Sequence, residues 1–311
     1  MHHDKNLQQL FDEFIKECQY SSRLQSETLR GYKEVFHLFV LVMPEITETK
    51  ALTFEMLIEF FKRIQFRERI VGRGIIKTGI KNSTVKTYHS KLNIFFEWLL
   101  KNSMIPDNPL HKIKPPEVNY EDKRALDDTD VRKLYSAVTL HSQNSLVLRR
   151  DTAMLSLLLF SGIRLGEFIS LEVRDIDFEK EILTIRGQMS KSKRTRYIPL
   201  HPTLKFHLQD YISERNKLKY TTQYLIVSNV SDRPLSRNGL KHWVNNMCKK
   251  SGVKFHIHRF RHSFACNLAN KDVNAAKIQK LLGHSSLNMT MTYLRSINTE
   301  DLKNEINRLS F

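Results

Sequence analysis

HIHRFRH (residues 256–262) and LGHSSLNMTMTYLR (residues 282–295) hold imidazoles, a guanidinium and a phenol within a short span of the chain. Two earlier segments, SGIRLGE (161–167) and SKSKRTR (190–196), add a second guanidinium and a primary amine. Such groups can grip a phosphate and move protons around it. The residues of interest are Arg164, Lys191, His258, Arg261, His284 and Tyr293.

Each of these segments also has an ordinary structural interpretation. Arg164 follows a glycine and could stabilise the C-terminus of a helix. Lys191 could be one more exposed cation in a turn, and Tyr293 could be a packing residue. The histidines in 256–262 could bind a metal, but the chain has no HExxH motif, no cysteine pair and no carboxylate partner there. We therefore expect no metal site and no cofactor.

The fold class expected from the pattern is mainly α with a small antiparallel β-sheet, in two domains. Apolar residues recur at helical spacing in four segments of the first third, and no strand pattern interrupts them. This predicts a helical domain over residues 1–112. The four segments are Leu7–Cys18, Leu29–Val40, Thr53–Ile64 and Asn82–Leu99.

A proline-rich connector is expected to separate the two domains. Residues 106–124 hold four prolines and a charge run, which favour an extended chain. We place a linker at 113–124 and the second domain, with a C-terminal tail, at 125–311.

The second domain is predicted to be helical around a small sheet. An apolar helix, Ala153–Phe160, ends at Ser161-Gly162, and residues 171–200 alternate as antiparallel strands do. The further helices are expected at 203–218, 237–250, 259–270, 274–282 and 287–295. Gly283 should end one of them and Ser285 or Ser286 should cap the next. Without that break, His284 and Tyr293 would lie on opposite faces of one straight helix.

The charge of the chain indicates a polyanionic partner. Fifty Lys and Arg residues against 33 Asp and Glu give a net charge of +17, which suits nucleic acid because phosphate contacts release counterions. An anionic membrane surface, or charge that merely solubilises, is the alternative. No apolar run reaches the ~20 residues of a membrane span. The polar N-terminus is unlike a signal peptide, and the three scattered cysteines fit a reducing cytoplasm.

A basic loop, RERIVGRGIIKTGIKNS (67–83), lies between the third and fourth predicted helices. Its glycines free the backbone and its cations suit phosphate, so it could follow a DNA strand or be a solvated hairpin. The residues predicted to bind DNA, here and in the second domain, are Arg67, Arg69, Arg73, Lys77, Lys81, Lys86, Lys193 and Arg194.

In their order and spacing the four segments resemble the motifs of the tyrosine recombinases, the family of phage integrases and Xer chromosome-dimer resolvases. Phe260 replaces the leucine common in H-x-L-R, at a packing position. The first domain resembles the family's core-binding domain more loosely, at residues 83–88 and Asn108-Pro109. The likeness implies an Xer-sized architecture without an added arm-binding domain. The two arginine boxes match at Arg164 and at His258 with Arg261, the hairpin lysine at Lys191, and the tyrosine box at His284 with Tyr293.

The resemblance implies a DNA strand transfer through a 3′-phosphotyrosine bond, without metal or ATP. Tyr293 would be the nucleophile, and the two arginines would hold the phosphate oxygens. Lys191 would protonate the leaving 5′ oxygen and His258 would accept the tyrosine proton. His284 would orient the phosphate by a hydrogen bond.

The resemblance also implies partners. The substrate would be double-stranded DNA with specific recombination sites, bound by two chains per site and four per synapse. Apolar residues recur at helical spacing in the tail, which would pack on a neighbouring chain or on its own domain. These residues are Leu302, Ile306 and Leu309.

Two other functions stay open from the sequence. A type IB topoisomerase shares the tyrosine chemistry, and a DNA-binding regulator could keep the fold without activity. Among recombinases, we favour an integrase of a mobile element over chromosome-dimer resolution or phage integration.

Overall fold

A computed structural model describes residues 5–72, 74–118, 125–189, 194–228, 231–287 and 290–291. The chain divides into two compact units, Met1–Tyr120 and Glu121–Phe311. Several residues singled out above lie outside the described residues, namely Arg73, Lys191, Lys193, Tyr293, Leu302, Ile306 and Leu309.

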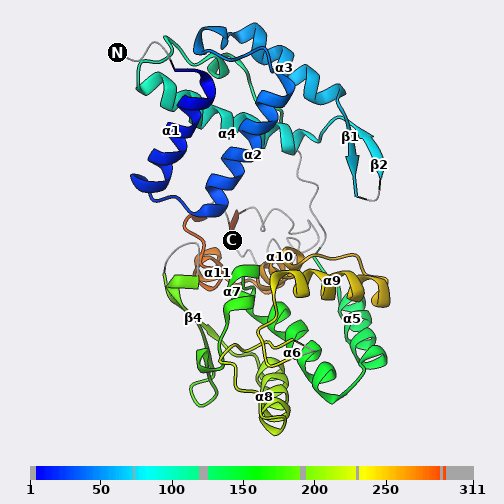
Figure 1. Ribbon diagram of the computed structural model, residues 1–311. Helices are drawn as coiled ribbons and strands as arrows, with labels where there is room; N and C mark the ends of the chain where they lie inside the picture. Colours follow the sequence, from blue (N-terminus) through cyan, green and yellow to red (C-terminus); the bar gives the residue numbers. More distant parts are fainter. Residues whose placement is uncertain are drawn as a thin grey trace, which may run out of the picture. The chain divides into compact units, whose positions relative to one another are not determined.

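The first unit is a helical bundle around an aromatic core (Figure 1). Side chains cap two of its helices, since Asn6 accepts from Gln9 N and Thr53 accepts from Met56 N. Its α-helices and 3-10 helices are α1 (Leu7–Tyr20), α2 (Ser26–Val42), η1 (Thr49–Ala51), α3 (Phe54–Phe66), α4 (Asn82–Lys101) and η2 (Pro109–Lys112). The rings of the core are those of Phe11, Phe14, Phe36, Phe39, Phe60, Phe95 and Phe96. The four predicted helices are confirmed.

The solvated hairpin that the sequence left open for residues 67–83 is confirmed, although no strand pattern marked it in the sequence. Strands β1 (Glu68–Val71) and β2 (Ile75–Thr78) pair in antiparallel register, with Ile70 opposite Ile76. Gly72 and Gly74 have positive φ and make the turn between them. Nearly every residue of the hairpin is exposed, so it lacks the half-buried alternation by which a strand is recognised in a sequence.

The second unit surrounds a buried helix, α6 (Ser145–Ser161). This helix is apolar on almost all sides, as expected for one at the centre of a domain. It contacts α5, α8 and α10. The helices are α5 (Asp128–His141), α7 (Leu165–Ser170), η3 (Val173–Asp175), η4 (Gly187–Met189), α8 (Pro202–Lys217), α9 (Arg237–Ser251), α10 (Ile257–Ala269) and α11 (Ala275–Leu282).

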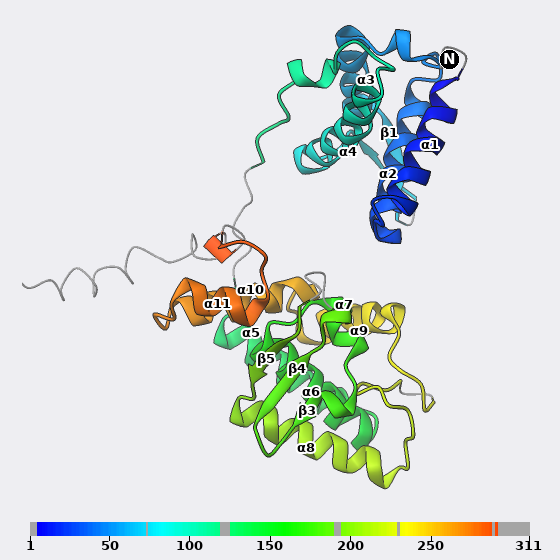
Figure 2. The ribbon, with the colours of Figure 1, turned by 90° about the vertical axis from the view of Figure 1, so that its left-hand side faces the viewer.

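The predicted small antiparallel sheet is confirmed in this unit. Its strands are β3 (Ile176–Asp177), β4 (Ile182–Ile185) and β5 (Arg196–Pro199), in the order β3-β4-β5. They lie side by side in Figure 2. The connection from β4 to β5 includes the segment 190–193, which lies outside the described residues.

Gly162 ends α6, as the sequence predicts, and turns the chain toward α7. Its φ is +56°, and a Cβ atom at this position would lie 2.4 Å from Cδ1 of Phe264. Only glycine fits such a backbone conformation beside so close a neighbour. The turn brings Arg164 to the N-terminal end of α7.

No helix in the described part of the chain is both long and apolar enough to cross a membrane.

Candidate active site

Four of the predicted site residues line one cavity of about 530 Å³ in the second unit. Arg237 and His256 line it as well, and none of its described lining residues is Asp or Glu. The cavity is therefore electropositive and suits an anion. The four predicted residues are Arg164, His258, Arg261 and His284.

Arg164 enters this cavity from the N-terminal end of α7. Its backbone N–H donates to Glu167 Oε2 (2.8 Å), and its Nη1 donates to Glu167 Oε1 (3.1 Å). Its Nη2 donates to the carbonyl of Gly283 (3.0 Å). The side chain is 25% exposed, so a guanidinium fixed on two sides still faces the cavity.

Arg261 and His258 come from the first turns of α10. Arg261 is only 2% exposed, and it donates to the carbonyls of Gly162 (2.6 Å) and Leu282 (2.7 Å). His258, three residues earlier, is exposed and lines the same cavity. Both residues lie on α10, and their spacing puts them on one face of the helix.

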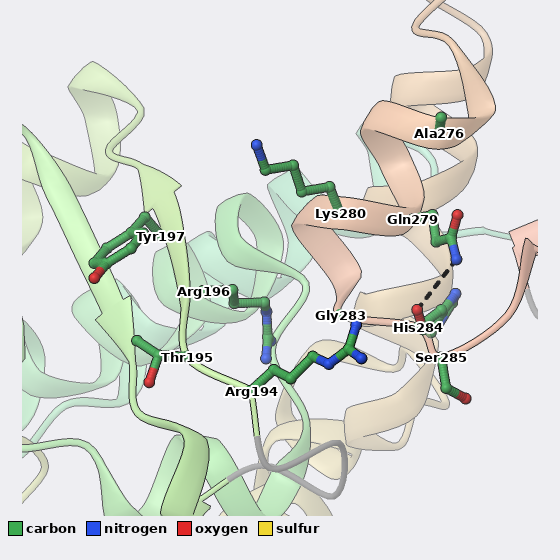
Figure 3. Close-up of a pocket in the computed structure, with 10 residues that line it drawn as sticks. All are labelled: Arg194, Thr195, Arg196, Tyr197, Ala276, Gln279, Lys280, Gly283, His284 and Ser285. Atoms are coloured by element: carbon green, nitrogen blue, oxygen red, sulfur yellow. Dashed lines mark hydrogen bonds between the residues drawn. The ribbon is translucent and has the colours of Figure 1, made fainter.

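A third arginine, Arg196 of β5, holds Glu167 and the end of α11 in place beside Arg164 and Arg261. Its Nη1 and Nη2 donate to the two oxygens of Glu167 (2.9 and 2.7 Å), and its Nε donates to the carbonyl of Leu281 (2.9 Å). Burial alone would raise the pKa of Glu167, yet the hydrogen bonds and charges of Arg196 and Arg164 lower it. Glu167 is therefore an ionised carboxylate held between two arginines. Figure 3 shows Arg196 beside Gly283.

Three successive carbonyls at the C-terminal end of α11 each accept a hydrogen bond from a different arginine. These carbonyls have no partner within the helix, and cations stabilise the negative end of the helix dipole. Arg164 therefore also stabilises the C-terminus of a helix, as its ordinary structural interpretation suggests, and this helix is α11. The pairs are Leu281 with Arg196, Leu282 with Arg261, and Gly283 with Arg164.

Replacing Arg196 by alanine is expected to destabilise the second unit by about 3–5 kcal/mol, because Glu167 would stay buried without its bidentate partner. Urea unfolding, followed by the fluorescence of Trp243 in a Trp98→Phe background, measures this loss. Arg194→Ala is the matched control, since Arg194 is exposed two residues away. Equal stability of the two variants would contradict the support role of Arg196.

His284 follows the break that the sequence predicts at Gly283. Gly283 ends α11 with φ +64°, and helical residues resume at Leu287. Capping by Ser285 or Ser286 stays a prediction. His284 is 8% exposed, and its Nδ1 forms a 2.8 Å hydrogen bond with Oγ1 of the fully buried Thr290.

The ring of His284 is neutral at physiological pH. Burial, and then the charges of Arg261, Arg164 and Arg196, lower its pKa from 6.5 to about 4. A neutral imidazole carries one N–H. When Thr290 donates to Nδ1, that proton is on Nε2, where the ring can donate to a ligand in the cavity.

This pKa predicts a loss of stability in acid. As the pH falls from 6.5 towards 4, His284 takes up a proton in the unfolded chain but not in the folded chain. Between about pH 7 and about pH 4.5, His284 should therefore lower the free energy of unfolding by about 2–3 kcal/mol. Unfolding of the wild type and of His284→Asn at both pH values isolates this contribution. An identical pH dependence in the two proteins would contradict it.

The described residues predicted to bind DNA are all exposed. Arg69 and Lys77 face each other across the β1–β2 hairpin, where Arg69 Nε donates to the carbonyl of Gly79 (2.8 Å). In the first unit they are Arg67, Arg69, Lys77, Lys81 and Lys86, and in the second unit Arg194.

Sequence reasoning missed four residues that build or line the site. Arg196 alternates in burial with its neighbours along β5, and this alternation was the available signal. Arg237 and His256 line the cavity but match none of the recombinase motifs named above, although His256 is the first residue of the segment 256–262. Thr290 lies within the tyrosine box, and nothing in the sequence marks it as the partner of His284.

Comparison with known proteins gives a consistent family. Residues 124–300 match the model of the phage integrase family. The chain is 30% identical over 289 residues to a tyrosine recombinase of Thermosipho africanus, with 89% of this chain and 92% of that protein covered. It is 27% identical over 296 residues to tyrosine recombinase XerC of Bacillus pumilus, with 93% and 92% covered.

Solved structures share the fold. The Tn1549 transposon integrase in complex with transposon right end DNA has a TM-score of 0.77 at 18% identity, over 97% of this chain and 98% of that one. A lambda integrase dimer bound to a COC′ core site has a TM-score of 0.69 at 21% identity, over 94% and 79%.

The likeness that four short segments suggested is therefore confirmed over most of the chain. The relatives are recombinases along nearly their whole length, which favours a recombinase over the topoisomerase and regulator alternatives. This chain belongs to the phage integrase family and is a tyrosine-type site-specific DNA recombinase.

Proposed function

We propose that this recombinase cuts DNA through a covalent bond between Tyr293 and a 3′ phosphate, without metal or ATP. One observation carries the proposal: Arg164, Arg261, His258 and His284, from distant parts of the chain, line a single cavity with no described carboxylate. Such a cavity stabilises the charge that develops on a phosphate under attack.

The proposed cleavage exchanges one bond to phosphorus for another. The oxygen of Tyr293 forms a bond to phosphorus, and the bond from phosphorus to the 5′ oxygen breaks. A phenol has a pKa near 10, so its proton must be accepted, and His258 is an exposed base of the cavity. Lys191 donates a proton to the leaving 5′ oxygen. Attack by a 5′ hydroxyl of another strand reverses these steps and rejoins the DNA.

The donor set of the cavity favours cationic side chains over a metal as the charge-bearing group. Mg²⁺ takes oxygen ligands such as carboxylates, and the described lining offers guanidinium and imidazole groups in their place. Two guanidiniums can each present paired N–H groups to the phosphate oxygens.

We propose duplex DNA as the substrate, bound by both units. The net charge of +17 and the exposed cations of the β1–β2 hairpin support contacts to the DNA backbone. A similar lambda integrase is bound to its core site as a dimer, and two chains per site with four per synapse fit strand exchange. Residues 1–112 then form the core-binding domain and residues 125–311 the catalytic domain.

We propose that the tail links neighbouring chains. The second unit has a mainly apolar cavity of about 460 Å³, lined by residues of α5, α6, β5 and α10, among them Val131, Phe160 and Leu268. The apolar spacing of the tail, given above, suits such a cavity on a second copy better than open solvent. Docking onto its own unit is the alternative.

A trapping experiment tests the proposed chemistry. Random-sequence duplexes are incubated with the full chain in EDTA without ATP, the mixture is denatured, and DNA that stays attached to protein is sequenced. A duplex of the recovered sequence, nicked beside the cleavage position, should accumulate a covalent adduct because the freed fragment diffuses away. If the tightest-binding duplexes give no adduct, or only with added metal, the proposal is wrong.

A further inference from the structure

A second and larger cavity, of about 740 Å³, is also lined by His284. Figure 3 shows Tyr197 of β5 and Arg194, two residues before that strand, on one side, and Lys280 of α11 on the other. None of its described lining residues is Asp or Glu. Arg196 also borders it, but its charge is already paired with Glu167. Arg194 and Lys280 therefore give this cavity its positive charge.

The face that α11 turns toward this cavity is suited to a bulky anion. Ala276, Gln279, Lys280 and Gly283 recur at the spacing of one helix face. Ala276 and Gly283 leave room, while Lys280 is exposed and Gln279 Nε2 donates to the carbonyl of His284. Lys277 is also exposed on α11, but it does not line the cavity.

His284 lines both cavities, so they are neighbours. We propose that the second cavity binds a backbone phosphate of the DNA adjacent to the phosphate that is cut. Arg194 and Lys280 hold its oxygens. This inference rests on the proposed function, because the first cavity must hold the phosphate under attack.

The chemistry of the second cavity fits a nucleotide better than a small free anion. Tyr197 is 65% exposed and adds an aromatic ring to the lining of the cavity that holds the two cations. Cations near an aromatic ring are the usual means of holding a nucleic acid strand. The contact would fix the strand on both sides of His284 and so hold the scissile phosphate in register.

The salt dependence of DNA binding tests the charge contact. The probe is a fluorescein-labelled duplex selected from a random-sequence pool by binding alone, so that the test does not depend on cleavage. Lys280→Ala and Arg194→Ala should each reduce the slope of log Kd against log salt by about 0.9, the value for one phosphate. Lys277→Ala, which removes the same charge from the same helix, should leave the slope unchanged. If Lys280→Ala and Lys277→Ala give the same slope, the inference is wrong.

Substitutions at Ala276 separate charge from bulk. Ala276→Glu places a negative charge in the cavity, and Ala276→Gln adds the same volume without charge. The glutamate variant should raise the Kd about tenfold more than the glutamine variant, through repulsion of the phosphate. An equal loss in both would overturn recognition of an anion at this position.

Neutral phosphates locate the contact on the DNA. On the trapped and mapped duplex, a methylphosphonate replaces one phosphate at a time on either side of the cleavage position. At one flanking position the methylphosphonate should lower the affinity of the wild type. At that same position it should not lower the affinity of Lys280→Ala any further. If the methylphosphonate lowered the affinity of Lys280→Ala at every flanking position, the assignment would be wrong. A failed trapping experiment refutes the proposed function instead, and the salt slopes still report on the cavity.

Discussion

Phenylalanine at position 293 is expected to abolish the covalent protein–DNA adduct completely. The substitution keeps the aromatic ring and removes the oxygen that we propose attacks phosphorus. Binding should change by no more than about twofold in Kd, because a neutral phenol neutralises no phosphate. Denaturing gels of the nicked duplex measure the adduct, and fluorescence anisotropy measures the Kd.

A second tyrosine serves as the control for this variant. Tyr220→Phe makes the same chemical change in a half-buried residue that lines neither cavity, and it should form the adduct at the normal rate. An adduct in Tyr293→Phe would show that another side chain is the nucleophile. Loss of DNA binding in Tyr293→Phe would show that Tyr293 serves the fold or the interface.

Removing Arg164 or Arg261 is expected to slow cleavage about 10²- to 10³-fold, the effect of losing one preorganised donor to a developing oxyanion. Arg261→Ala also leaves the carbonyls of Gly162 and Leu282 without their donor, so its effect should be the larger of the two. Arg164→Ala removes the donor to Gly283. Single-turnover cleavage of the nicked duplex gives both rates.

Lysine variants separate charge from geometry. Arg261→Lys keeps the charge, but an ammonium cannot present the planar fork that reaches two carbonyls and a phosphate. It should recover less than about a tenth of the lost rate. Arg132→Ala, an exposed arginine of α5, controls for net charge and should cleave normally. Near-normal cleavage in both alanine variants would show that the phosphate binds elsewhere.

Much of the fold follows from local sequence pattern. Helices such as α1 and α4 alternate between apolar and polar faces, and their buried residues match the expected ones closely. The glycines at 162 and 283 mark helix ends because positive φ is costly for other residues. The principal site residues emerged only from the joint order of four segments, since a single arginine or histidine has many roles.

The parts that sequence did not reveal depend on long-range or exposed structure. The β1–β2 hairpin buries no face, so its strands leave no periodic pattern. Arg196 acts through Glu167, 29 residues earlier in the chain, and through Leu281, 85 residues later. Such partners are set by the packing of α7, β5 and α11. The neutrality of His284 likewise arises from burial, and then from the charges of three arginines that gather only in the folded protein.

The three arginine contacts to the end of α11 make the assembly of the anion cavity cooperative. A single turn of backbone, at residues 281–283, anchors Arg164, Arg196 and Arg261 at once. A displacement of these residues would remove the carbonyl acceptors of all three arginines together. A partly assembled cavity would therefore be disfavoured.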